Sequence, residues 1–298
     1  MLKHDASYGS PALRLPPLGE QAELVYDSLV EQTRDTLKQT DFSEFVLGLS
    51  GGLDSALVAT IAVDALALDG IDSRQVQGII MPSQWTSQQS LDDAHELVKR
   101  LKIQSNSFDI MPTYETINDT LAPAFDSKAK DVTEENIQAR IRAVFLMALS
   151  NKFDWLVLST SNLSELSVGY TTLYGDMIGA FAPLAPLYKT WVYELADFRN
   201  ARAGLLGLEL PIPRSILEKE PSAELAPNQT DRAALGSYRE LDALLYALNE
   251  GSKSVSELKQ LGFDSDYVDE IVHKVKSSEF KRLQAAPAAV LPQEFREN

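Results

Sequence analysis

Cysteine is absent from the 298-residue sequence, and histidine occurs at only three positions. The lack of thiols excludes disulfide bonds, thiolate metal sites and a cysteine nucleophile. A zinc site or a Ser-His-Asp triad would have to use His4, His95 or His273, and no two of these are close in sequence. We therefore expect chemistry that depends on neither thiol nor imidazole.

Positive charge and long apolar runs are also scarce. The chain has 27 Lys and Arg residues against 43 Asp and Glu residues, a formal net charge of −16. Nucleic-acid-binding domains are usually basic, so we expect no polynucleotide partner. No apolar run reaches the roughly 20 residues that span a bilayer, and the first residues lack the apolar core of a signal peptide. These features predict a cytoplasmic protein without membrane segments.

Short apolar runs alternate with helical patterns along the chain. Residues 1–18 are rich in Pro, Gly and Ser and are expected to form an extended arm or linker. The main domain is expected to span 19–287, with a tail at 288–298. Strands are predicted at 44–49, 76–81, 107–110 and 155–160, and helices at 20–38, 56–68, 91–101, 134–149 and 190–199. This order favours an α/β fold with a doubly wound, mostly parallel sheet and a helical C-terminal extension.

The most informative segment joins a predicted strand to a predicted helix, and it consists of Gly48, Leu49, Ser50, Gly51, Gly52, Leu53, Asp54 and Ser55. Two glycines allow a tight bend, and backbone N–H groups at a helix N-terminus favour an anion such as pyrophosphate. Asp54 would repel phosphate directly, so its useful role is to hold Mg²⁺. The segment is not a Walker A loop, because no G-x-x-x-x-G-K-[ST] motif occurs. The alternative is an ordinary strand–turn–helix corner.

The segment from Ser50 to Ser55 resembles the pyrophosphate-binding loop of the N-type ATP pyrophosphatases, which use ATP to adenylate a substrate. Further segments resemble NAD synthetases in particular: residues 133–142, 159–165, 169–176, 186–190, 221–225, 228–231 and 280–282. The similarity covers roughly residues 20–287. It is closest to the synthetase half of glutamine-dependent NAD synthetases.

The resemblance implies a homodimeric ligase that uses ATP and Mg²⁺. Such an enzyme adenylates deamido-NAD (nicotinic acid adenine dinucleotide), and ammonia then displaces AMP to give NAD. In glutamine-dependent members an N-terminal glutaminase with a cysteine nucleophile supplies the ammonia. That half is absent from this sequence. We therefore expect free ammonia, a separate glutaminase subunit or a missing glutaminase domain as the nitrogen source.

The resemblance also assigns residues. It implies that Asp54 and Glu165 bind Mg²⁺, that residues 48–55 bind ATP together with Thr160, Lys189 and Ser222, and that deamido-NAD contacts Asn136, Arg140, Glu165 and Lys281. Asp176 is the candidate acceptor of the ammonium proton, so the expected catalytic set is Asp54, Glu165, Lys189 and Asp176. Without the resemblance, Glu165 would be an ordinary first-turn glutamate, and Asn136 and Arg140 a solvated helix face.

Two positions depart from the family pattern. Ser161 stands where the family commonly has glycine, and Ala185 or Pro186 where it has aspartate. We expect these changes to affect affinity more than reaction type. Two alternatives stay open: another ATP-pyrophosphatase amidotransferase, such as a GMP synthetase-like domain, and a non-catalytic nucleotide-binding subunit. The presence of Asp54, Glu165 and Lys189 argues against the second.

Overall fold

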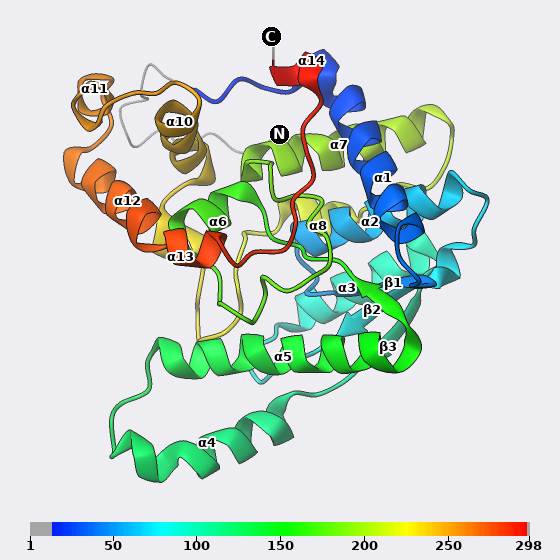
Figure 1. Ribbon diagram of the computed structural model, residues 1–298, viewed down its shortest axis with the longest axis horizontal. Helices are drawn as coiled ribbons and strands as arrows, with labels where there is room; N and C mark the ends of the chain where they lie inside the picture. Colours follow the sequence, from blue (N-terminus) through cyan, green and yellow to red (C-terminus); the bar gives the residue numbers. More distant parts are fainter. Residues whose placement is uncertain (1–13, 297–298) are drawn as a thin grey trace.

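A four-stranded parallel sheet lies at the centre of the computed structural model, which describes residues 14–296 (Figure 1). The strand order is β3-β2-β1-β4, with β1 (Glu44–Gly48), β2 (Val76–Ile80), β3 (Gln104–Ser107) and β4 (Trp155–Val157). The chain moves from β1 outward to β3 and then returns to the other side of β1. The strand order therefore reverses between β1 and β4, the position where open α/β sheets bind ligands. The α/β prediction is confirmed.

Side chains of the sheet alternate between two apolar cores. In β1, Phe45 and Leu47 face one core and Val46 faces the other, and all three are fully buried. Burial on both faces explains why β1 has an uninterrupted apolar run at residues 45–47.

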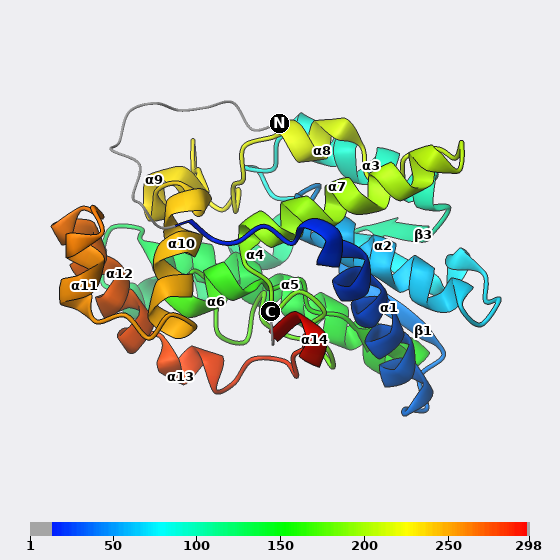
Figure 2. The same ribbon diagram turned by 90° about the horizontal axis from the view of Figure 1, so that it is seen from above.

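Helices cover both faces of the sheet (Figures 1 and 2). One face packs against α1 (Ala22–Lys38), α2 (Leu53–Ala67), α3 (Gln88–Leu101) and α7 (Lys189–Leu205), and the other against α4 (Met111–Phe125) and α5 (Val132–Phe153). The remaining short helices before the C-terminal third are η1 (Gly19–Gln21), η2 (Ser73–Gln75), α6 (Leu163–Val168) and α8 (Arg214–Glu218). Within residues 14–296, no helix has both the length and the apolar character needed to cross a membrane.

The C-terminal third is helical, as predicted. It contains α9 (Asp231–Leu235), α10 (Tyr238–Asn249), α11 (Val255–Gln260), α12 (Ser265–Ser277), α13 (Glu279–Arg282) and α14 (Gln293–Arg296). Helices α10 and α12 both pack on α6 (Figure 2). An isolated bridge between Ala182 and Ala288 brings the last residues back to the segment that follows the sheet.

The third strand differs from the prediction of 107–110. The structure forms β3 from the polar and exposed residues Gln104–Ser107, which pair with β2 alone at the edge of the sheet. Backbone pairing decides the position of such an edge strand, whereas Ile110 is fully buried in the core just before α4. The apolar pattern in the sequence therefore indicated a residue of the core, Ile110, and not the position of the strand.

The predicted N-terminal arm falls mostly outside the described residues, but its last part packs on α7. The indole Nε1 of Trp191 donates to the Pro16 carbonyl oxygen over 2.8 Å, and the Leu18 N–H donates to the Glu194 carboxylate over 2.7 Å. Leu18 is buried. Residues 16–18 therefore pack against the domain.

Candidate active site

A cavity of about 290 Å³ opens at the carboxyl ends of β1 and β4. The expected residues that line it are Gly48, Leu49, Ser50, Gly52, Leu53, Asp54, Ser55, Thr160, Glu165, Asp176, Lys189 and Ser222. The structure thus brings the predicted catalytic residues and nearly all of the predicted ATP-binding residues to one cavity. Gly51 lies behind it and packs against α3.

Residues 48–55, here called the glycine corner, form a closed turn between β1 and α2. Gly51 has a positive φ of 74°, which L side chains rarely adopt. The Gly52 N–H donates to Ser50 Oγ over 3.1 Å, and Ser55 Oγ donates to the Gly52 carbonyl oxygen over 3.1 Å. The corner places the N-terminus of α2, with its positive dipole end, at the cavity.

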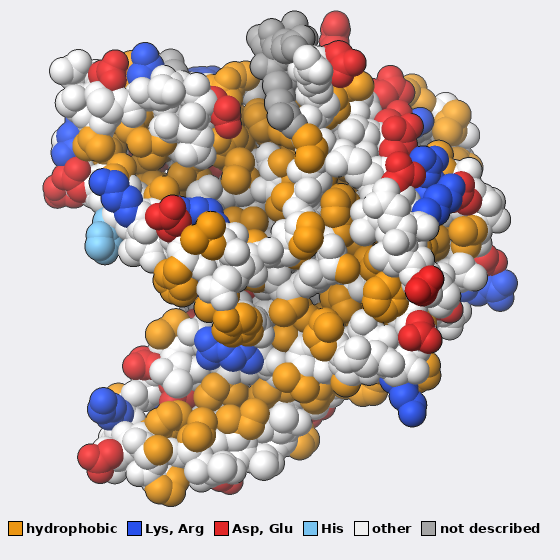
Figure 3. Space-filling model, viewed as in Figure 1, with side chains coloured by type: hydrophobic (Ala, Val, Ile, Leu, Met, Phe, Trp, Pro, Cys, Tyr) orange, Lys and Arg blue, Asp and Glu red, His pale blue; other side chains and the backbone are white. Residues whose placement is uncertain are grey.

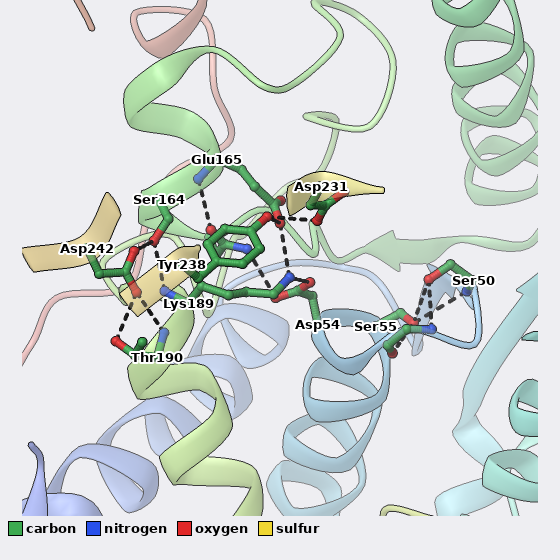
Figure 4. A network of polar contacts seen from close by, with 12 residues as sticks. Ser50, Asp54, Ser55, Ser164, Glu165, Lys189, Thr190, Asp231, Tyr238 and Asp242 are labelled. Carbon is green, nitrogen blue, oxygen red and sulfur yellow. Dashed lines mark hydrogen bonds and ion pairs between the residues drawn. The ribbon is translucent and has the colours of Figure 1, made fainter. Parts of the chain in front are cut away.

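Next to the corner, the ammonium of Lys189 lies between two carboxylates. Lys189 Nζ donates to Asp54 Oδ2 and, over 3.0 Å, to Glu165 Oε1 (Figure 4). The three residues come from the first turns of α7, α2 and α6. Lys189 is only 3% exposed. A cation at a helix N-terminus is unfavourable, so the two carboxylates are needed to offset it.

Burial changes the acid–base properties of this group. Desolvation raises the pKa of Glu165 to about 7, although the Lys189 charge opposes the shift. Burial alone would lower the pKa of Lys189, but the charges of Asp54 and Glu165 raise it above its ordinary value. Lys189 therefore stays cationic.

Two further residues complete what we call the ion cluster: Asp54, Glu165, Lys189, Asp231 and Tyr238. The Tyr238 hydroxyl donates to Asp231 Oδ2 over 2.8 Å and lies 3.2 Å from Glu165 Oε1. The Tyr238 ring centroid lies 5.2 Å from Lys189 Nζ, within cation–π range. Sequence reasoning missed both roles. Asp231 was part of a family-like segment without an assigned role, and no sequence signal pointed to Tyr238.

A buried carboxylate on α10 holds α6 and α7 together. Asp242 accepts hydrogen bonds from the Thr190 N–H and hydroxyl, each over 2.8 Å, and from the Ser164 hydroxyl. Ser164 Oγ in turn accepts from the Lys189 N–H over 2.8 Å. These bonds satisfy N–H groups at the start of α7 and fix the backbone that carries Lys189.

The geometry is compatible with a magnesium ion. Asp54 and Glu165 already converge on one cation, the ammonium of Lys189, and both line the cavity. Among residues 14–296, no three or more His, Cys, Asp or Glu side chains are grouped as a ready metal site. Mg²⁺ commonly takes one or two carboxylates and completes its ligands with water and substrate phosphate oxygens. The two carboxylates fit that pattern.

Asp176 and Ser222 line the cavity from two loops. Asp176 Oδ1 accepts the Thr172 N–H over 2.7 Å, and burial raises the pKa of Asp176 to about 6 despite that bond. Ser222 Oγ donates to the Gln229 carbonyl oxygen and accepts the Glu224 N–H, so its hydroxyl bonds within its own segment.

The residues expected to bind deamido-NAD, apart from Glu165, lie outside the cavity lining. Asn136 Oδ1 accepts from the Thr172 hydroxyl over 2.6 Å, and Arg140 Nε donates to the Leu173 carbonyl oxygen over 3.2 Å. Lys281 Nζ donates to the carbonyl oxygens of residues 169 and 171. All three thus hold the loop at 169–176, which carries Asp176.

Arg142 is a cavity residue that sequence reasoning did not select. Its Nε donates to the Met81 carbonyl oxygen over 3.0 Å, and the residue lines the cavity. Burial lowers the pKa of Arg142 to about 10. Its position two residues after Arg140, within a family-like helix, was a signal that could have identified it.

The departures from the family pattern lie in different surroundings. Ser161 lines the cavity, and its N–H and hydroxyl both lie within hydrogen-bond distance of Ser159 Oγ. Ala185 is buried in a small apolar cluster with Leu166 and Met177. Only Ser161 therefore borders the space that a nucleotide would occupy.

Comparison with known proteins gives a consistent result. A model of the family described as NAD synthase matches residues 25–285. The glutamine-dependent NAD(+) synthetase of Acinetobacter baylyi is 46% identical over 91% of this chain and 48% of its own length. The chain spans about half the length of the curated relatives that it matches.

Two solved structures match over nearly their full length. The NMN synthetase from Francisella tularensis has a TM-score of 0.71 at 29% identity and covers 91% of this chain and 98% of its own. The NH3-dependent NAD synthetase from Campylobacter jejuni has a TM-score of 0.68 at 26% identity. The match covers 87% of this chain and 96% of that protein. Since the family match runs through every strand and helix that builds the cavity, the chain belongs to the NAD synthase family.

Proposed function

We propose that this chain amidates deamido-NAD to NAD with ATP, Mg²⁺ and ammonia, through an NAD-adenylate, and releases AMP and pyrophosphate. The observation that carries the proposal is one cavity in which the glycine corner adjoins the ion cluster. The corner suits the pyrophosphate part of ATP. The nicotinate carboxylate then attacks the α-phosphorus, the bond to pyrophosphate breaks, and ammonia later displaces AMP from the activated carbonyl.

In this proposal the protein acts by positioning and charge stabilisation. Backbone N–H groups of the corner hold the pyrophosphate, and the Lys189 ammonium offsets negative charge that develops on it. Asp54 and Glu165 would hold Mg²⁺, which when bound neutralises phosphate charge. Thr160, which follows β4 and lines the cavity, is suited to the adenosine side. Arg142 offers guanidinium donors to an anionic part of either substrate.

Asp176 is proposed to accept the proton that ammonium must lose before it can attack as ammonia. A carboxylate with a pKa near 6 is mostly ionised at neutral pH and can still take up a proton transiently. Asn136, Arg140 and Lys281 would support deamido-NAD binding through the 169–176 loop that they hold.

Ammonia is the proposed nitrogen donor. The chain matches a protein described as an NH3-dependent NAD synthetase over 96% of that protein's length. The 298 residues of the sequence contain no cysteine that could serve as a glutaminase nucleophile. We expect turnover with ammonium and none with glutamine alone; a separate glutaminase subunit would restore glutamine use.

The similarity to an NMN synthetase supports a second candidate, the amidation of nicotinic acid mononucleotide. Both substrates present the same nicotinate carboxylate, so the same residues would serve. A larger kcat/KM with the mononucleotide than with deamido-NAD would favour this candidate.

A homodimer is proposed through the outer face of α5. Its exposed apolar residues are Val132, Val144, Met147 and Phe153, and Leu121 of α4 lies in the same layer. Apolar side chains gather over the α4 and α5 layer in Figure 3. Such a surface is typical of a protein interface. We expect Val144→Asp to shift sedimentation from dimer to monomer.

The decisive experiment measures AMP and dinucleotide formation with ATP, Mg²⁺ and ammonium. Deamido-NAD should support AMP release, whereas xanthosine monophosphate should not. Asp54→Ala should stay folded by circular dichroism and lose activity. Full activity in this variant would remove the metal assignment, and ATP binding without any ammonia-dependent amidation would favour a non-catalytic subunit.

A further inference from the structure

Lys219 lines the cavity and contacts the glycine corner on the side where Gly51 packs against α3. Its Nζ donates to the Gly51 carbonyl oxygen over 2.6 Å, to Asp93 Oδ2 over 3.1 Å and to Ser90 Oγ over 3.1 Å. The Lys219 side chain is 17% exposed and that of Asp93 only 5%. The ammonium therefore connects the corner to α3 by short, charge-assisted bonds in a mostly buried setting.

The bond to Gly51 has a consequence for the next N–H group. In a trans peptide unit the C=O and the following N–H point in opposite directions. Since Lys219 holds the Gly51 carbonyl on the α3 side, the Gly52 N–H is turned the other way, toward Ser50 Oγ at 3.1 Å. Gly52 and Ser50 line the cavity. An ammonium on the carbonyl also polarises that N–H and makes it a better donor.

The position of Lys219 is itself fixed. It belongs to a segment, residues 219–231, that we call the strap. On one side Glu224 accepts from the hydroxyls of Ser87 and Ser90, each over 2.8 Å, at the start of α3. On the other side the strap meets α5, where Gln138 Nε2 donates to the Leu225 carbonyl oxygen over 2.9 Å. The middle of the strap, at Glu224 and Leu225, is thus anchored to both α3 and α5, five to six residues after Lys219.

The close packing of Gly51 against α3 leaves the glycine corner little conformational freedom. A Cβ on Gly51 would lie 2.1 Å from the Ser90 carbonyl oxygen, so the turn is pressed against α3. Ser215 on α8 also donates to Asp93, which orients the carboxylate that receives Lys219. The corner therefore has an external support that is distant in sequence.

We infer that Lys219 is a positioning residue for pyrophosphate: it holds the Gly51–Gly52 peptide so that the Gly52 N–H faces the anion. In this role Lys219 acts through its bond to the Gly51 carbonyl oxygen, although its side chain also lines the cavity. The inference rests on the proposed function, because it takes the glycine corner as the pyrophosphate site.

The test uses Lys219→Met, Lys219→Arg and, as a matched control, Lys38→Met, which removes an exposed ion pair with Asp69 far from the cavity. Binding of Mg²⁺-pyrophosphate is measured by calorimetry, and the Gly52 amide signal by NMR with selective ¹⁵N-glycine labelling. The chain has 15 glycines, so the spectrum stays sparse. Gly52→Ala assigns the signal.

We expect Lys219→Met to weaken pyrophosphate binding by about tenfold and to shift the Gly52 amide of the free protein. Deamido-NAD binding should stay within about twofold. Lys219→Arg should recover much of the affinity, and Lys38→Met should match the wild type. If Lys219→Met does not fold, Lys219→Gln takes its place in the same measurements.

Three results would overturn the inference while leaving the proposed function intact. These are unchanged pyrophosphate affinity in Lys219→Met, weaker affinity with an unchanged free-state Gly52 amide, and equal loss of both ligands together with a lower melting temperature. A wild-type Gly52 amide that does not respond to Mg²⁺-pyrophosphate would instead contradict the proposed function.

Discussion

The glycine corner and the ion cluster adjoin the same cavity but are held in place by different means. The corner is one continuous segment, residues 48–55, and its internal hydrogen bonds join neighbours in sequence. The ion cluster takes Asp54, Glu165, Lys189, Asp231 and Tyr238 from five different helices. Apart from Asp54, which belongs to both, the corner is built of backbone dipoles and hydroxyls, whereas the cluster concentrates buried charge. Substitutions in the corner should therefore act mainly through backbone conformation, and substitutions in the cluster mainly through the balance of charge.

The largest expected effect comes from removing the cation of the ion cluster. Lys189→Met should lower kcat by about 100- to 1000-fold, because the charge that offsets the leaving pyrophosphate is lost. It should also destabilise the fold by about 3–5 kcal/mol, since two largely buried carboxylates lose their partner. Urea denaturation with and without Mg²⁺ checks both parts. Mg²⁺ should stabilise this variant more than the wild type, and equal stabilisation would contradict the paired-carboxylate site.

Substitutions in the glycine corner should destabilise the protein through backbone conformation and not through charge. Gly51→Ala should cost about 2–4 kcal/mol, because the residue has a φ of 74° and its Cβ would overlap the Ser90 carbonyl oxygen at 2.1 Å. Gly52→Ala is the matched control: its φ is −95°, and its Cβ would meet only Ser50 Oγ at 3.2 Å. Chemical denaturation of both variants measures the difference, and similar stabilities would show that the corner is not conformationally restricted.

Asp242 should link stability to pH. Burial raises the pKa of Asp242 from 3.8 to about 6, so the folded protein binds this proton more tightly than the unfolded chain. The stability contributed by the protonated group is present below about pH 4 and is lost as the pH rises through about 6. Asp242→Asn should remove this part of the pH dependence, about 1–3 kcal/mol between those limits. Denaturation midpoints across the range measure it, and parallel curves for the two proteins would be inconsistent with a raised pKa.

The smallest effect is expected at the edge of the ion cluster. Tyr238→Phe keeps the ring near Lys189 but removes the hydroxyl that donates to Asp231. The loss should cost about 1 kcal/mol and lower activity only a few-fold. Thermal denaturation and the amidation assay measure these changes. A loss of activity as large as that of Lys189→Met would mean that Tyr238 contacts substrate directly.

Much of the candidate site could be predicted because its residues occupy short segments next to strand ends. Asp54 follows β1 and Glu165 follows β4, and parallel neighbouring strands bring such segments to one edge. Lys219, Asp242 and Tyr238 could not be selected in the same way. They lie in helices or loops with no motif, and their roles depend on contacts across 52 to 168 residues of sequence.

The sequence by itself determined the alternation of strands and helices, the bend at the glycine corner and the charges available to the site. It did so because apolar periodicity, glycine conformation and residue type are local properties. Only the tertiary structure decided that Lys189 lies between Asp54 and Glu165, that Asn136, Arg140 and Lys281 hold the 169–176 loop, and that Lys219 supports the corner. Those contacts depend on how separate helices pack over the sheet, and packing depends on the whole chain at once.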